Sequence, residues 1–159
     1  MTLNYNVTED ALWAMTFAEM AATRDGRGTA RPADVLLGIM LVSDPMFSPE
    51  IPCVGGFLLR ASCTAPDDLP TLRGLGWDEI PEHPSFGGKL SPSVSELLRA
   101  ADQLRQELGA KYIGSEHLLL SLVAESFDDD VDAWVIDAQL TEAGLLRQWV
   151  AVLLRAGSG

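Results

Sequence analysis

Leu108–Leu120, with the sequence LGAKYIGSEHLLL, ends one amphipathic helix, makes a turn and begins another helix within thirteen residues. The same arrangement recurs in weaker form earlier in the chain. When the sequence is shifted against itself by about 83 positions, without a gap, equivalent residues fall into register: Ser91 with Thr8, Gly109 with Gly26, and Leu118–Leu122 with Val35–Ile39. Self-similarity at a fixed spacing is typical of repeated structural units, so the chain is predicted to hold two copies of one helical unit.

The spacing of apolar residues predicts helices and no persistent strand. Val94, Leu97, Leu98, Ala101 and Leu104 repeat at the interval of a buried helical stripe. Seven or eight helices are expected, and the better-defined ones are a helix beginning at Thr8, Ala33–Val42, Val54–Ser62, a helix beginning at Ser91-Pro92, one from Ser115 to about Glu125, Ala133–Ala143 and Leu145–Leu154. The predicted fold class is therefore all-α.

Start and stop signals support these bounds. Thr8 and Ser91 are residue types that accept hydrogen bonds at a helix N-cap, and Pro92 suits the first helical position. Gly26 and Gly109 are expected to end the two equivalent helices. We predict one domain over residues 1–159, with repeat one at about 7–72, a linker at about 73–89, and repeat two at about 90–155. Trp77 and Phe86 are expected to hold the linker against the core.

These motifs resemble the Clp amino-terminal domain, the double-repeat module at the head of Clp-type AAA+ unfoldases. The resemblance lies in Leu90–Glu125 and in Leu140–Leu145, where the second copy keeps nearly all of the family's Tyr-Ile-Gly-Thr-Glu-His-Leu-Leu-Leu motif. The first copy keeps the apolar frame and loses the polar motif. The family implies two pseudo-symmetric repeats of about four helices each, packed as one domain that recruits substrates or adaptors.

Composition limits the location and the partners. The 159 residues are 47% hydrophobic, which is enough for one core. No apolar run approaches the roughly 18 residues of a membrane span, and the amino terminus lacks the features of a signal peptide, so a cytoplasmic location and no membrane partner are expected. A net charge of −12 argues against nucleic acid as a partner. Cys53 and Cys63 are expected to be reduced structural thiols.

The segment Gly114–His117 places a Ser, an acid and a His in succession. Consecutive helical residues point about 100° apart, so these groups cannot form a catalytic relay. We expect a structural arrangement in which Gly114 permits the turn, Ser115 caps the helix, Glu116 is an exposed acid that complements the helix dipole, and His117 packs near Tyr112.

The same helix start also suggests a ligand site, because free amides there can hold an anion and a carboxylate can pair with a guanidinium. The family resemblance implies that Gly114, Ser115 and Glu116 form a phosphoarginine-type site. In the first repeat, Pro32 stands where the hydroxyl belongs and Ala33 where the acid belongs. One of the two pseudo-symmetric pockets is therefore expected to be lost.

The predicted function is non-enzymatic. There is no Gly-rich nucleotide-binding motif of the P-loop type, so the chain is no ATPase by itself, and no cofactor is expected. The spacing of His83, His117 and the acids at 128–132 matches no zinc or EF-hand pattern. The resemblance implies that the partners are substrate proteins, peptides or adaptors of a Clp unfoldase, and extends to cyclic-peptide antibiotics. The alternative is a small acid-base or metal-assisted hydrolase using Glu116, His117 and His83. The sequence leaves open whether the chain is part of a longer unfoldase or free-standing.

Overall fold

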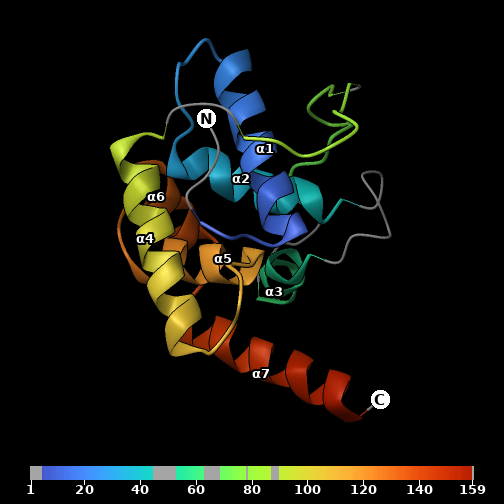
Figure 1. The fold of residues 1–159 in the computed structure, drawn as a ribbon, viewed down its shortest axis with the longest axis vertical. Coiled ribbons are helices and arrows are strands. Elements are labelled where there is room, and N and C mark those ends of the chain that lie inside the picture. Colours follow the sequence, from blue (N-terminus) through green and yellow to red (C-terminus); the bar gives the residue numbers. More distant parts are fainter. Residues whose placement is uncertain (1–4, 45–52, 63–68, 78, 87–89, 159) are drawn as a thin grey trace.

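The computed structural model describes residues 5–44, 53–62, 69–77, 79–86 and 90–158, with side chains up to Val150. All regular elements in these ranges are helices, arranged around a shared core (Figure 1). They are α1 (Glu9–Arg24), α2 (Pro32–Val42), α3 (Val54–Ser62), α4 (Pro92–Glu107), α5 (Ser115–Ala124), α6 (Asp129–Asp137) and α7 (Glu142–Ser158). The all-α prediction is confirmed.

The helix pairs α1–α2 and α4–α5 follow the predicted register. Helices α1 and α4 start at residues 9 and 92 and end at 24 and 107, so both bounds differ by 83 positions. Helices α2 and α5 start at residues 32 and 115, again 83 apart. Thr8 and Ser91 both cap as predicted, since their hydroxyls accept from the amides of Ala11 and Val94 at 3.4 and 3.2 Å.

Both long helices also end in the same way. Gly26 and Gly109 have φ values of +75° and +74°, in the left-handed region that favours glycine. Their amides donate to the carbonyls of Thr23 and Gln106, each at 3.1 Å. The predicted stop signals are therefore confirmed at the level of backbone hydrogen bonds.

Two isolated parallel β-bridges cross between the halves of the chain. Val7 pairs with Ile113, and Ala30 pairs with Leu90. In the first bridge, the Thr8 amide donates to the Ile113 carbonyl and the Ile113 amide donates to the Asn6 carbonyl, both at 2.9 Å. A shift of 83 positions converts one bridge into the other. The segment that precedes each long helix is thus paired with the turn of the opposite repeat.

Glycines allow the helices to approach closely at two contacts. A Cβ on Gly38 of α2 would overlap the backbone of Ala14 in α1, and a Cβ on Gly55 of α3 would lie 2.6 Å from the Ser115 carbonyl oxygen in α5. Close packing of α3 against α5 therefore explains glycine at position 55, although glycine lowers helix propensity. Helix α3 forms over the predicted range.

The segment between the halves is held by aromatic side chains, as predicted. Trp77 and Phe86 are buried. The Trp77 ring lies 6.1 Å from that of Phe17, and the Arg24 guanidinium lies 4.6 Å over the Trp77 ring. Residues 72–76 make a helical turn within this segment, with the Leu75 amide donating to the Thr71 carbonyl at 3.0 Å. The predicted residue bounds of the repeats and linker stay a prediction.

The last two helices lie differently from the prediction. Helix α6 begins four residues earlier than the expected Ala133, because the Asp128 side chain caps it by accepting from the Asp130 amide at 2.9 Å. Helix α7 begins at Glu142, where the Thr141 hydroxyl accepts from the Gly144 amide at 3.0 Å. Between them Gln139 adopts a φ of 58°. Within the described residues, no helix has the length and apolarity to cross a membrane. The cytoplasmic location stays a prediction.

Candidate functional site

The start of α5 is capped by Gly114 and His117. Ser115 is the first helical residue and Gly114 is the N-cap, so the prediction that Ser115 caps the helix is wrong. The Gly114 amide donates to His117 Nδ1 at 2.8 Å, which satisfies a donor that the helix itself leaves free. A Cβ on Gly114 would overlap the Glu116 carboxylate, so glycine at this position makes room for that side chain.

Ser115 is fully buried and joins three helices. Its hydroxyl donates to Asp10 Oδ2 in α1 at 2.6 Å and accepts from the Gly55 amide in α3 at 2.8 Å. The Cys53 thiol lies 3.5 Å from the same oxygen. These contacts occupy the hydroxyl, so in this conformation it has a structural role at the junction of α1, α3 and α5.

Glu116 is not the exposed acid that the sequence predicts. Its side chain is only 12% exposed. Burial, followed by the nearby negative charge of Asp10, raises the pKa of Glu116 to about 7. A carboxylate that protonates near neutral pH, beside a second buried carboxylate, makes this helix start a place that favours positive charge.

His117 is neutral and lies inside the protein. Burial lowers the pKa of His117, and the positive charge of Arg105 lowers it further. Its Nδ1 lies 3.4 Å from Glu116 Oε1, but Nδ1 accepts from Gly114 and carries no proton, so the two side chains form no ion pair. The His117 ring meets Trp149 edge-on at 5.9 Å. The Tyr112 side chain is half exposed, and the expected packing of His117 near it stays a prediction.

The equivalent start of α2 is built from different groups. Asp34, at the position equivalent to His117, accepts from the Arg31 amide at 2.8 Å. It also forms a two-pronged ion pair with Arg27, one contact of which is 2.9 Å. The Ala33 amide donates to Asp128 Oδ2 at 3.3 Å. A carboxylate of the protein itself thus already occupies the start of α2.

Comparisons with known proteins agree with this architecture. Residues 76–130 match the Clp repeat (R) N-terminal domain family. The chain is 29% identical over 118 residues, 74% of its length, to the chaperone protein ClpC3 of Oryza sativa subsp. japonica. It is 28% identical over 79% of its length to the chaperone protein ClpB of Mycobacterium tuberculosis. These regions are 12% and 14% of the two relatives' lengths.

Solved structures give the same fold at low sequence identity. The N-terminal domain of the Clp-associated chaperone ClpD from Arabidopsis thaliana superposes with a TM-score of 0.54 and 17% identity, covering 93% of this chain and 97% of that domain. A chain from a malarial protein secretion system superposes with a TM-score of 0.61 and 14% identity, covering 92% and 93%. The chain thus has the fold of a Clp N-terminal domain, and its residues 76–130 match that family.

The other candidate groups lie on other elements of the chain. His83 is exposed in the segment between the halves, whereas His117 is 1% exposed within α5. Asp130 pairs with Arg31 at 3.6 Å, and Asp128 caps α6. Over the described ranges, no three His, Cys, Asp or Glu side chains are placed to hold a metal ion.

Of the two cysteines, the structure describes Cys53 alone. Cys53 is buried and free, and burial raises its thiol pKa to about 11, which makes it a poor nucleophile. Cys63 lies outside the described residues. The sequence did not indicate Asp10, whose carboxylate accepts from the Ser115 hydroxyl at the predicted site. No residue pattern around the first turn of α1 indicates that the fold places Asp10 against the start of α5.

Proposed function

We propose that this Clp N-terminal domain is a non-enzymatic module that binds substrate proteins, peptides or adaptors for a Clp-type ATP-dependent unfoldase. The similarity to the Clp chaperones ClpC3 and ClpB carries the proposal. The chain spans only about an eighth of the length of these relatives, so the larger activity belongs to a partner or to further domains.

The geometry gives little support to the alternative hydrolase. His117 is buried and uses Nδ1 to accept a backbone hydrogen bond, while the Ser115 hydroxyl is held by Asp10 and Gly55. A general acid or base must reach the proton that it transfers. His83 is the exposed histidine, and its place between the two halves of the chain differs from that of His117 on α5.

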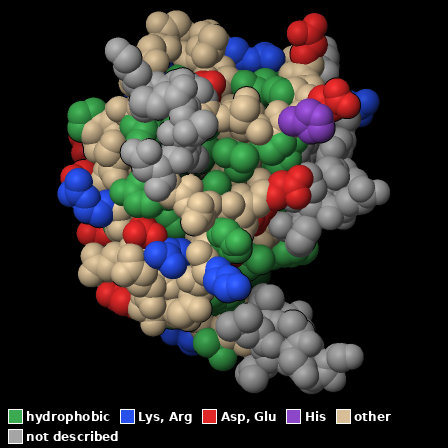
Figure 2. Space-filling model, viewed as in Figure 1, with side chains coloured by type: hydrophobic (Ala, Val, Ile, Leu, Met, Phe, Trp, Pro, Cys, Tyr) green, Lys and Arg blue, Asp and Glu red, His purple; other side chains and the backbone are tan. Residues whose placement is uncertain are grey.

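The surface supports recognition of protein chains. Phe57 of α3, Ile136 of α6 and Val150 of α7 are exposed large apolar side chains. On the face drawn in Figure 2, hydrophobic side chains reach the surface in several places, among separate acidic and basic groups. Exposed apolar groups set among charged ones are suited to contacts with unfolded segments or adaptors.

The α5 start is proposed to recognise the guanidinium part of an arginine or phosphoarginine side chain. Glu116 and Asp10 place two carboxylates together. No ion pair within the described ranges puts Lys or Arg on either of them. A guanidinium would neutralise both acids, and the Glu116 side chain would turn outward to receive it. The phosphate of phosphoarginine would have to bind the amide of Ser115, because the Gly114 amide already donates to His117.

A titration with three matched peptides tests this site. The peptides carry arginine, phosphoarginine or citrulline at one position, and the chain is compared with Glu116→Gln. Binding of both charged peptides, weakened about tenfold or more by loss of the charge-assisted contact in Glu116→Gln, supports the guanidinium site. Glu96→Gln, an exposed acid on α4, is the matched control and should bind like the unaltered chain. Equal binding of the citrulline peptide contradicts the guanidinium site.

The recruitment role needs a separate experiment. A Clp unfoldase lacking its own N-terminal domain is mixed with the chain, and complex formation and substrate degradation are followed. Stimulated degradation of a model substrate, inhibited by a cyclic-peptide antibiotic that binds Clp N-terminal domains, supports the module and extends it to a drug-sequestering role. Failure to bind both the unfoldase and the peptides contradicts the proposed function.

A further inference from the structure

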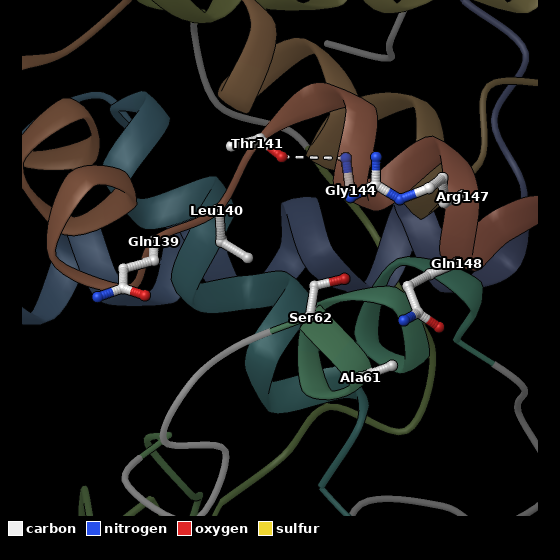
Figure 3. A pocket seen from close by; sticks show the side chains of 8 residues that line it. All are labelled: Ala61, Ser62, Gln139, Leu140, Thr141, Gly144, Arg147 and Gln148. Carbon is white, nitrogen blue, oxygen red and sulfur yellow. Dashed lines mark hydrogen bonds between the residues drawn. The ribbon is translucent and has the colours of Figure 1, made fainter.

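A polar hollow of about 240 Å³ lies between the C-terminal end of α3 and the first turns of α7 (Figure 3). Ser62 lines it from α3, Gln139 and Thr141 from the connection before α7, and Arg147 and Gln148 from α7. The hollow is smaller than the roughly 300–1,000 Å³ of sites for drug-sized ligands. Its size suits a single functional group with a few waters.

The charge of this hollow differs from that of the whole chain. The sequence has 23 acidic and 11 basic residues, yet none of the described residues that line the hollow is acidic, and Arg147 is the charged one. Glu142, the nearest acid in sequence, lines a different hollow between α4 and α5. In the part of the chain that the structure describes, no ion pair involves Arg147.

The donors converge on the amino-terminal end of α7. This helix runs over 17 residues, Glu142–Ser158, and the positive end of its dipole lies at the hollow. The Arg147 guanidinium folds back toward this end, because its Nη2 lies 3.8 Å from the place where a Cβ on Gly144 would stand. Thr141, which accepts from the Gly144 amide, lies on the same rim (Figure 3).

The Ser62 hydroxyl is an independent sign of an absent partner. Its Oγ is buried and makes no hydrogen bond, although a buried hydroxyl is almost always paired. In Figure 3 it points into the space between α3 and α7. A hydroxyl, a guanidinium, two primary amides and a helix amino terminus together form a set rich in hydrogen-bond donors.

We propose that this hollow binds an oxyanion carried by a peptide, either a carboxylate or a phosphate group, with Arg147 and Ser62 as its principal contacts. A guanidinium matches both groups because its planar fork can donate two parallel hydrogen bonds to them. The site is separate from the α5 start, so it would give the domain a second contact with a bound peptide. Its chemistry is opposite to that of the guanidinium site.

The test uses the full chain labelled with nitrogen-15 and two probes, inorganic phosphate and a short acetylated peptide with a free C-terminal carboxylate. Saturable shifts of the Ser62, Gly144 and Arg147 amide signals with either probe are expected, and the amidated peptide should give none. The probe that binds more tightly identifies the source of the oxyanion. Absence of saturable shifts with both probes overturns the proposal.

Variants separate this site from the other one. Arg147→Gln should weaken binding about tenfold or more through loss of a charge-assisted contact, and Ser62→Ala by a smaller factor. Arg99→Gln, on the exposed face of α4, removes the same charge elsewhere and should leave binding unchanged. Glu116→Gln should also leave it unchanged. Unaltered binding in Arg147→Gln, or loss of binding in Glu116→Gln, would show that the anion does not bind in this hollow.

Discussion

The starts of α2 and α5 occupy equivalent places in the two repeats but differ in electrostatic character. At α2, Asp34 is paired with Arg27, and Asp128 accepts from the Ala33 amide. At α5, Glu116 and Asp10 lie together without a cation from the described residues, and His117 is neutral. The comparison teaches that one backbone arrangement can carry a self-neutralised start in one repeat and an uncompensated acidic start in the other.

The strongest test of the shared frame compares two leucines that are 83 positions apart. Leu119 in α5 and Leu36 in α2 are both buried. Truncation of either to Ala should lower the free energy of unfolding by roughly 2–5 kcal/mol, since it removes apolar contacts and leaves a cavity. Urea unfolding followed by circular dichroism measures both. A negligible loss at one leucine alone would break the equivalence of the two repeats.

The second test removes the charge balance at α2. Asp34→Asn leaves the Arg27 guanidinium without its main partner, at a position where the Arg27 side chain is only one quarter exposed. Breaking such a pair should cost about 3 kcal/mol. Asp25→Asn, which removes the exposed partner of the same arginine, should cost less than about 1 kcal/mol. Similar losses for the two variants in thermal unfolding would contradict the difference in burial.

The third test replaces Glu116 at the start of α5, and here we expect the variant to gain stability rather than lose it. The Glu116 pKa rises from 4.5 to about 7 on folding, so the folded state holds a proton that the unfolded state loses. Stability should therefore fall as the pH rises from about 4.5 to about 7, and Glu116→Gln should remove this slope. Above pH 7 the variant should be more stable by roughly 1–3 kcal/mol.

Unfolding curves at several pH values distinguish this outcome from an ordinary surface change. If Glu116→Gln behaves like the control Glu96→Gln at every pH, the side chain is solvated in solution and the acidic start is not strained. If the variant is less stable above pH 7, the carboxylate makes a net favourable contact there. Either result would contradict an uncompensated acidic start at α5, and the preference for a guanidinium would then have to come from other groups.

The smallest expected effects concern the helix caps that the two repeats share. Thr8→Ala and Ser91→Ala should each destabilise by about 1 kcal/mol, because each removes a side-chain cap. Ser91→Ala removes the acceptor of the Val94 amide, whereas the Ala11 amide keeps Asp10 Oδ1 as an acceptor at 3.0 Å in Thr8→Ala. Thr8 should cost somewhat more, since its hydroxyl also donates to Asp10. Thermal unfolding of both variants gives the comparison. A larger loss at Ser91 would contradict a stabilising hydrogen bond between Thr8 and Asp10.

The sequence predicted what depends on local signals. The caps at Thr8 and Ser91, the stops at Gly26 and Gly109, and the span of α3 all follow from residue types acting on their own backbone neighbours. The resemblance to the Clp repeat supplied the arrangement of the helices. The caps and the stops occur in both halves because they depend only on residues that are close in sequence.

What the sequence could not predict depends on which element packs at each helix start. In the sequence Glu116 is indistinguishable from an exposed first-turn acid, whereas in the fold it is largely buried and feels the charge of Asp10 from α1. In the sequence Asp128 belongs to a run of acids that is typical of a solvated segment. In the fold it lies at the start of α6, where it accepts from the Ala33 amide. The site residues differ from expectation because tertiary contacts decide their solvation.

The crossed bridges between Val7 and Ile113 and between Ala30 and Leu90 bear on the ancestry of the fold. Each copy gives its leading segment to the turn of the other and receives the same in return. A polypeptide with one copy alone would lack both pairings, and two such polypeptides could restore them by exchanging segments across a twofold axis. The chain thus has the connectivity expected of two copies of one repeat joined in a single polypeptide.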